Sequence, residues 1–175
     1  HQPRRQRQMC IRDSSRVQIE LQAKIHNAGR EDREAQMIFK IFENTSDSLV
    51  YESSQSSQIA AGTNTTINHQ LEIAHPKLWS VASPLLYRLE SHVQIGGKST
   101  DIYHSQFGLR SILFDAEKGC FLNGESIKLK GVCNHQDHAG VGTGILRTID
   151  EWRLKQLKAM GCNAIRTAHN PPAPH

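Results

Sequence analysis

The stretch GVCNHQDH at residues 131–138, together with NAIRTAHNPP at residues 163–172, decides the fold of the C-terminal part of the chain. In each, a short apolar strand pattern is followed by a histidine, His135 or His169. Parallel strands joined by a helix bring their carboxyl ends to one edge of a sheet, where ligand sites form. The two imidazoles are therefore predicted to face one pocket from neighbouring strands about 4.8 Å apart.

The segment between these two stretches has the pattern of a helix. Thr148 and Glu151 match a capping box, in which a hydroxyl and a carboxylate satisfy backbone N–H groups of the first turn. Gly161 predicts a left-handed residue directly after the helix. Apolar residues between these signals lie close to helical spacing, namely Ile149, Trp152, Leu157 and Met160. The sequence thus predicts a strand-helix-strand unit, which cannot bury its apolar surface alone.

Residues 15–112 have the pattern of an all-β domain. Apolar and polar residues alternate with a period of two, which is typical of strands with one solvated face. A serine-rich run at residues 53–57 indicates a solvated edge strand. Six or seven short strands over about a hundred residues favour an immunoglobulin-like β-sandwich. The strand patterns cover residues 17–25, 37–41, 49–59, 67–73, 85–95 and 102–107.

Several side chains of this domain are candidates for binding that we assign to structure instead. Trp79 lies beside prolines before a strand, where packing at the end of a sandwich is favoured over stacking on a sugar. Five histidines are expected on polar faces or turns, and none is a candidate for catalysis: His26, His69, His75, His92 and His104.

Three motifs in the second half of the chain resemble one known family. They are FGLRSILFD at residues 107–115, GCFLNGESIKLKGVCNHQDH at residues 119–138, and KAMGCNAIRTAHNPP at residues 158–172. Their residues and their order along the chain resemble glycoside hydrolase family 2, the β-galactosidase, β-glucuronidase and β-mannosidase family. The HQDHAGVG wording is most similar to a β-galactosidase branch. The resemblance implies a mainly β fold, in which an immunoglobulin-like β-sandwich is followed by the first βαβ part of a truncated (β/α)8 TIM barrel.

The domain organisation follows from these patterns and from the N-terminus. The peptide RRQRQMCIRDS at residues 4–14 resembles the translation of a transposase-based sequencing adapter, so we interpret residues 1–14 as adapter-derived and non-native. The alternative is a genuine basic arm. Residues 15–112 are then the sandwich, and residues 113–175 are the N-terminal part of the truncated barrel.

The resemblance implies a fragment of a retaining glycoside hydrolase that cleaves terminal β-linked sugars, most similar to β-galactosidases. Retaining enzymes use two carboxyl groups about 5–5.5 Å apart. The family's two catalytic glutamates are expected downstream of this chain, and Glu117, Glu125 and Glu151 lie where no barrel rim is expected. The full-length protein is thus interpreted as a glycosidase, and the chain as given is predicted to be inactive.

The binding wall of the expected site lies within the chain. By motif position, His135 and His169 match family histidines that contact sugar hydroxyls, and Asp137 and Asn170 are predicted to reach the same pocket. No catalytic residue, metal ligand or cofactor is assigned to this fragment. Arg166 is expected to brace the barrel interior through an ion pair with a carboxylate.

Composition excludes several other classes of function. The formal net charge of +4 falls to +1 without residues 1–14, which leaves 17 basic against 16 acidic residues. Such a balance does not provide the basic patch with which proteins bind nucleic acid or an anionic membrane. No apolar run approaches the roughly 20 residues of a membrane span. Outside residues 1–14, three cysteines remain without CxxC spacing, which favours buried thiols over a disulfide framework or a zinc site.

The expected partners are therefore a carbohydrate substrate, the remainder of the barrel, the N-terminal sugar-binding domain of the same protein, and further copies in a homo-oligomer. Neither nucleic acid nor a membrane is expected. An alternative hypothesis from another class is that the sandwich is a non-catalytic carbohydrate-binding or scaffold module. The fold does not distinguish the enzyme from the module, because one fold hosts many chemistries. Paired glutamates at the ends of later barrel strands would indicate the enzyme, and their absence would favour the module.

Overall fold

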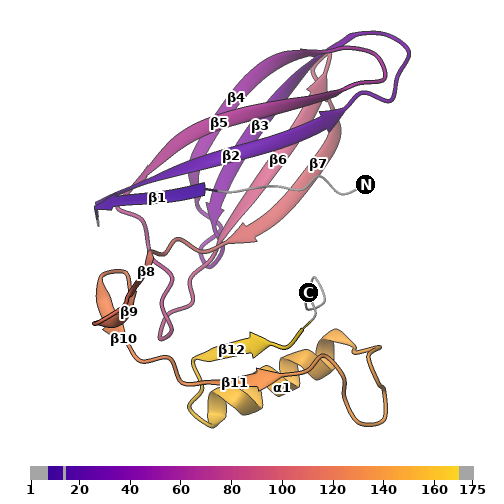
Figure 1. Ribbon diagram of the computed structural model, residues 1–175. Helices are drawn as coiled ribbons and strands as arrows, with labels where there is room; N and C mark the ends of the chain where they lie inside the picture. The colour runs from indigo at the N-terminus through magenta and orange to yellow at the C-terminus, as the bar shows by residue number, and fades with distance from the viewer. Residues whose placement is uncertain (1–7, 14, 170–175) are drawn as a thin grey trace. The chain divides into compact units, whose positions relative to one another are not determined.

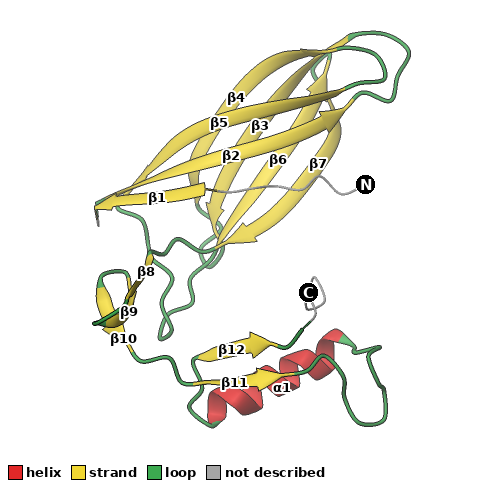
Figure 2. Ribbon diagram, viewed as in Figure 1, coloured by secondary structure: helices red, strands yellow, loops and turns green. Residues whose placement is uncertain are grey.

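The computed structural model describes the backbone of residues 8–13 and 15–169 and the side chains of residues 15–169. The chain divides into two compact units, His1–Ile112 and Leu113–His175, which are described in turn. Strands dominate both units, and the described residues contain a single helix (Figures 1 and 2). Within this described part, that helix is too short and too polar to cross a bilayer.

The first unit is a β-sandwich of two antiparallel sheets. One sheet has the strand order β1-β2-β5, and the other has the order β4-β3-β6-β7, so the serine-rich strand β4 is an edge strand. The predicted immunoglobulin-like architecture is confirmed. The strands are β1 (Gln8–Asp13), β2 (Arg16–His26), β3 (Arg33–Glu43), β4 (Leu49–Ile59), β5 (Asn64–Ala74), β6 (Tyr87–Ile95) and β7 (Lys98–Phe107).

Alternating apolar residues build the core between the two sheets. β2 and β5 pair without a register shift, so that Val17 lies opposite Ile73 and Ile19 opposite Leu71. Across the gap, Phe39 of β3 is almost fully buried. Fifteen of the sixteen buried apolar residues among those described belong to this unit. Each large one contributes about 1.5–3 kcal/mol on burial, so the sandwich has a core of its own.

Strand β1 falls within the residues that we interpret as adapter-derived. Its backbone pairs with β2 from Gln8 opposite Glu20 to Asp13 opposite Arg16, with one register shift. Strand pairing uses backbone groups, so an open edge of β2 accepts an extended segment of any origin. The origin of residues 1–14 therefore stays a prediction.

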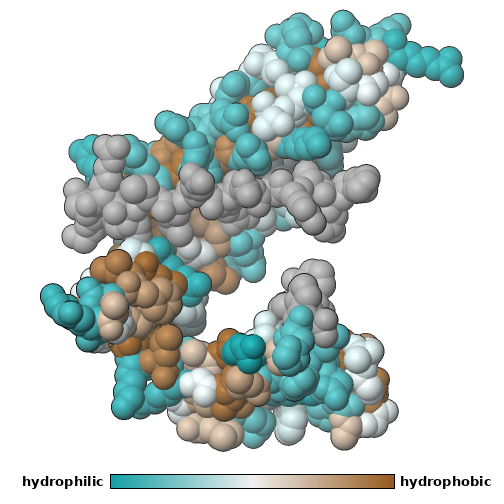
Figure 3. Space-filling view, in the orientation of Figure 1, coloured by the Kyte–Doolittle hydropathy of each residue, from teal (hydrophilic) through white to brown (hydrophobic). Residues whose placement is uncertain are grey.

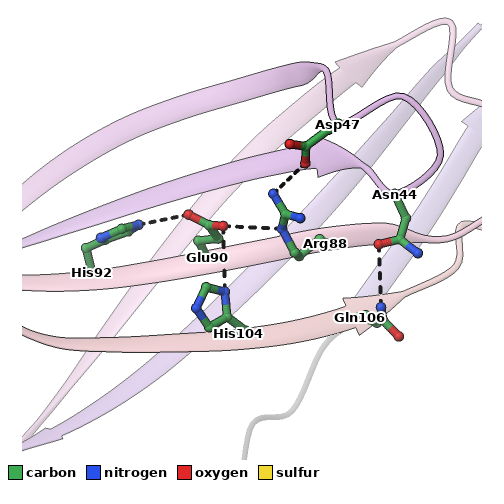
Figure 4. Close-up of polar contacts among 7 residues, drawn as sticks. All are labelled: Asn44, Asp47, Arg88, Glu90, His92, His104 and Gln106. Atoms are coloured by element: carbon green, nitrogen blue, oxygen red, sulfur yellow. Dashed lines mark hydrogen bonds and ion pairs between the residues drawn. The ribbon is translucent and has the colours of Figure 1, made fainter.

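A charged network lies on the outer face of β6 (Figure 4). The Glu90 carboxylate lies 3.2 Å from Arg88 Nε. Two histidines also contact it, His92 through Nε2 at 3.1 Å and His104 through Nδ1 at 3.6 Å. Arg88 Nη2 also donates to Asp47 Oδ1 at 2.7 Å. His92 and His104 thus lie on the polar face, where the sequence predicts them, and their partners are other side chains of the sandwich.

His69 differs from its predicted position on a polar face. Its ring stacks on Phe39 with centroids 5.2 Å apart, and its Nε2 lies 2.8 Å from the Tyr51 hydroxyl and 2.9 Å from Ser53 Oγ. The alternation in β5 explains this, because His69 is two residues after the buried Ile67 and therefore points to the same inner face of the sheet. The prediction was wrong because it followed the polarity of the side chain instead of its place in the repeat.

We expect His69 to make the stability of the sandwich depend on pH. Burial lowers the pKa of its imidazole below the ordinary value of 6.5, so the unfolded chain takes up the proton more readily than the folded one. The stabilisation by neutral His69 is thus present above that value and is lost as the pH falls through the lowered pKa. The His69→Gln variant should show a smaller drop in melting temperature between about pH 7.5 and about pH 5.5.

The matched control for this measurement is His26→Gln, because His26 is exposed on the same sheet. This control should keep the pH dependence of the unsubstituted protein. Equal pH dependence in all three proteins would show that His69 is not responsible.

Trp79 packs at one end of the sandwich. Its backbone N–H donates to the Leu109 carbonyl at 2.7 Å, and the Arg110 guanidinium lies 4.6 Å from its ring centroid. A Cβ at Gly108 would approach Trp79 Cδ1 to 3.0 Å, so only glycine leaves room for the indole there. These contacts agree with the packing role that the sequence favours.

The second unit contains a small antiparallel sheet followed by a βαβ unit. The strands β8 (Ile112–Asp115), β9 (Gly119–Leu122) and β10 (Glu125–Ile127) form a sheet of order β10-β9-β8. Asn123 and Gly124 form the two-residue turn of its hairpin, with φ values of 53° and 84°, as an Asn-Gly turn of type I′ requires. The βαβ unit consists of β11 (Gly131–Asn134), α1 (Arg147–Ala159) and β12 (Ala164–Thr167).

The helix α1 is present as predicted, but its first turn differs. Its N-cap is Leu146, whose side chain makes no capping hydrogen bond, and Thr148 is already inside the helix. The predicted capping box is therefore wrong, and Glu151 instead pairs with Arg147 Nε at 2.8 Å across one turn. At the other end, Gly161 has φ +88°, and the predicted left-handed position is confirmed.

Apolar surface remains exposed on the second unit. Figure 3 shows hydrophobic residues, in brown, gathered over the β8–β10 segment. Phe114 is 70% exposed and Trp152 55% exposed. Among the described residues of this unit, Ala168 is the only buried apolar one. This unit therefore lacks the internal core that the sandwich has, in agreement with the expectation that a βαβ unit cannot bury itself.

Candidate functional site

The candidate site lies at the carboxyl edge of the two-stranded parallel sheet. β11 and β12 pair in register from Gly131 opposite Ala164 to Asn134 opposite Thr167. Beyond the last pair, the Ala168 N–H donates to the Asn134 carbonyl at 3.1 Å. The segments that follow β11 and β12 therefore leave the sheet side by side. The first polar side chains after each strand lie at the same rim.

His135 and His169 are brought together at this rim. Their ring centroids are 5.5 Å apart, and the ring planes are tilted by 51°. Both side chains are exposed. His169 has φ +61°, a left-handed conformation that costs a non-glycine residue about 1–3 kcal/mol, so the contacts around this position have to hold it. Two adjacent imidazoles offer both hydrogen-bond donors and acceptors to a ligand that carries hydroxyl groups.

The residues that follow His135 differ in exposure and in their contacts with α1. Asp137 is exposed, and its backbone carbonyl accepts a hydrogen bond from Arg153. His138 Nδ1 donates to the Ala139 carbonyl at 2.8 Å, and its ring meets Trp152 edge-on at 6.2 Å. His138 therefore holds the loop against α1. Asn170, the remaining predicted site residue, lies outside the described residues.

The loop after His138 is a closed turn. His138 N–H donates to the Gly142 carbonyl, and Gly142 N–H donates to the His138 carbonyl, both at 2.9 Å. Gly140 and Gly142 have φ values of 86° and 61°. The two glycines allow the tight left-handed backbone path that closes this loop.

Two polar side chains at β12 and directly before it contact the neighbouring segment. Asn163 does so at the amino end of the sheet, since its carboxamide accepts from the Lys130 N–H at 2.8 Å and donates to the Lys128 carbonyl at 3.0 Å. Arg166 Nη1 lies 3.6 Å from Cys133 Sγ. The carboxylate partner that we expected for Arg166 is not found among the described residues.

Arg153 and Trp152 are the residues that sequence reasoning missed. Both belong to α1, and both contact the loop that carries His135 and His138. No motif could have revealed them, because their partners lie 14 to 18 residues earlier and become neighbours only when the helix returns past the loop.

A metal centre is not indicated at this rim. Among the described side chains, no group of three or more His, Cys, Asp or Glu residues is placed to hold a metal ion. Cys120, Cys133 and Cys162 carry free thiols, and Cys133 is exposed, although buried thiols were expected.

Substitution of Gly131 by alanine should displace the two imidazoles. A Cβ at this position would lie 3.0 Å from the Ala164 carbonyl oxygen, which belongs to the facing backbone and cannot rotate away. The β11 and β12 backbones then have to move apart by a few tenths of an ångström at the start of the ladder. In histidine ring NMR spectra, the Gly131→Ala variant should move the signals of both His135 and His169.

Gly144→Ala is the matched control, because a Cβ there has its nearest neighbour at 3.7 Å and Gly144 has no left-handed φ. It should leave both ring signals in place. Unchanged signals in the Gly131 variant would mean that strand pairing does not set the ring positions.

The chain thus has the class of architecture in which a β-sandwich domain is followed by the first βαβ unit of an α/β barrel, with two imidazoles at the carboxyl edge of its sheet. Comparison with known families agrees. The profile of glycosyl hydrolases family 2 matches residues 8–110, and that of the TIM barrel domain of glycosyl hydrolases family 2 matches residues 116–175. The chain therefore belongs to glycosyl hydrolases family 2.

The curated relatives include proteins named β-galactosidase and proteins named β-glucuronidase. The β-galactosidase BoGH2A of Bacteroides ovatus is 39% identical over 125 residues, which are 71% of this chain and 15% of that protein. A β-glucuronidase of Bacteroides fragilis is 39% identical over 104 residues, which are 59% of this chain and 15% of that protein. The chain thus spans less than a fifth of these relatives.

Solved structures show the same fold. A glycosyl hydrolase family 2 member from Bacteroides cellulosilyticus is 29% identical with a TM-score of 0.90, and the match covers 97% of this chain and 23% of that chain. The β-glucuronidase of Bacteroides uniformis is 23% identical with a TM-score of 0.90, and the match covers 96% of this chain and 20% of that one. The second likeness concerns the fold alone.

Proposed function

We propose that this chain is part of a retaining exo-acting glycosidase that removes terminal β-linked sugars, with β-galactosides as its substrates. The observation that carries the proposal is the pairing of His135 and His169, whose rings lie 5.5 Å apart at the carboxyl edge of the sheet. In family 2 barrels this edge is the catalytic face. The names of the relatives from Bacteroides species support a glycosidase.

In this proposal the two imidazoles bind hydroxyl groups of the sugar ring. Hydrogen bonds from a fixed imidazole accelerate the reaction only as far as they strengthen in the transition state. The acid/base and nucleophile are two glutamates on later barrel strands, outside residues 1–175. Asp137 and Asn170 contribute further contacts to the same sugar.

The class of sugar, neutral or uronic, is the finer part of the proposal. A uronate carboxylate needs a cationic partner, for which a bidentate arginine is the strongest choice. Arg153 lies beside the rim, but its two Nη atoms donate to the carbonyls of His135 and Asp137. Arg153 is thus occupied by backbone carbonyls, and the choice of a galactoside is supported by the HQDHAGVG motif and by the name of the Bacteroides ovatus relative.

The remaining partners follow from the surface of the second unit. Its exposed apolar residues, such as Leu113 and Phe114, need a cover, and the rest of the barrel with the N-terminal domain of the same protein supplies it. A non-catalytic scaffold or carbohydrate-binding role for the sandwich is the second candidate, and it is supported by the independent core of that unit.

The decisive experiment uses the full-length protein expressed from the contiguous reading frame. It should hydrolyse 4-nitrophenyl β-galactoside with a higher kcat/KM than the corresponding glucuronide. His135→Ala and His169→Ala should each lower kcat/KM about 100-fold, the usual cost of losing one hydrogen bond aimed at the transition state. His26→Ala, a change on the exposed face of the sandwich, should leave kcat/KM unchanged.

Two outcomes would oppose the proposal. Faster hydrolysis of the glucuronide would replace the galactoside with a uronide, and full activity after both histidine substitutions would remove the rim from the mechanism. Absence of paired glutamates from the remaining reading frame, with no hydrolysis of either compound, would favour the scaffold role.

The 175-residue chain by itself should hydrolyse neither compound, because the proposed catalytic glutamates lie outside it. Its exposed apolar surface should also make it aggregate on concentration. A turnover assay on purified chain, with light scattering on the same sample, checks both statements. Measurable turnover would place a catalytic carboxylate within residues 1–175.

A further inference from the structure

Arg153 connects α1 to the loop that carries His135. Its Nη1 donates to the His135 carbonyl at 3.2 Å, and its Nη2 donates to the Asp137 carbonyl. The two acceptors are two residues apart, so one guanidinium holds the loop on both sides of Gln136. The Arg153 side chain is only 14% exposed, although the helix is otherwise mostly solvated.

The neighbours of Arg153 on α1 strengthen this connection. Asp150, one turn earlier, has its Oδ1 3.9 Å from Arg153 Nη1 and favours the charged guanidinium in this place. Trp152 meets the His138 ring at 6.2 Å. Two consecutive helix residues thus hold the loop at points three residues apart, and the imidazole of His135 lies within the segment they hold.

We propose that Arg153 is a positioning residue of the sugar-binding rim, an inference that rests on the proposed function. His135 leaves the last paired residue of β11, so its ring position depends on where its own carbonyl is held. The Arg153 guanidinium fixes that carbonyl and the Asp137 carbonyl at once. It thereby sets the separation of the His135 and His169 rings.

Lysine cannot replace arginine in this role. The guanidinium is a planar fork whose donors reach two acceptors in a fixed geometry, whereas an ammonium is a single charged point. Arg153→Lys keeps the charge and the ion pair with Asp150 but loses one of the two carbonyl contacts. The loop then gains freedom, and a ring displaced by about 1 Å costs up to about 100-fold in rate.

A direct contact of Arg153 with substrate is not part of this role. Both of its Nη atoms donate to backbone carbonyls, and the side chain is largely covered. Arg153 therefore acts through His135, and the effect of changing it should depend on the presence of that imidazole.

The test is a double-mutant cycle in the full-length protein, with an aryl β-galactoside as the probe. Arg153→Lys should lower kcat/KM about 10-fold or more, and in a His135→Ala background it should lower kcat/KM less than about 2-fold. Equal losses in both backgrounds would show that Arg153 does not act through His135.

Arg147→Lys is the matched control, because Arg147 belongs to the same helix, is paired with Glu151 and is exposed. It should change kcat/KM less than about 2-fold. A similar loss from both arginine variants would mean that a general weakening of α1 explains the effect of Arg153→Lys, and it would overturn the inference.

Histidine ring NMR spectra separate this inference from the proposed function. Arg153→Lys should move the His135 signal, and Arg147→Lys should not. If the unsubstituted full-length protein hydrolyses no glycoside, the proposed function fails, and the His135 signal alone decides the positioning role. An unmoved signal would overturn that role whatever the activity.

Discussion

The parallel pairing of β11 with β12 is the constraint on which the candidate site depends. Four consecutive residue pairs fix the register, and the hydrogen bond from Ala168 to Asn134 continues it past the last pair. Since the chains then leave the same edge, His135 and His169 become neighbours although 33 residues separate them in sequence. Gly131 permits the close approach of the two backbones at the start of this ladder.

Polar groups, more than a core, hold the described βαβ unit together. The Asn163 carboxamide ties the amino ends of the two strands, and the Arg153 guanidinium ties the carboxyl end to α1. The sandwich is the opposite case, since its alternating strands bury their own apolar faces. One chain therefore joins a unit with a complete core to a unit whose apolar side chains are largely exposed.

Prediction from the sequence succeeded where a repeating pattern fixes which way a side chain points. It failed where the position of a single residue was predicted from the polarity of its side chain alone. The period of two located the sandwich strands, and Gly161 marked the end of α1. His69 was placed by its polarity, but the repeat turns it inward to stack on Phe39. The capping box failed because the helix begins at Arg147, which leaves Thr148 inside the first turn.

The sequence by itself determined the strand patterns, the helix between the two histidine motifs and the membership of a glycosidase family. These follow from local periodicity and from motifs whose residues are close together along the chain. Only the tertiary structure decided how far apart the two imidazoles lie, that the glycines after His138 close a turn, and that Arg153 holds the His135 loop. Each of these depends on contacts in space, which the return of the chain through α1 creates and which no local pattern encodes.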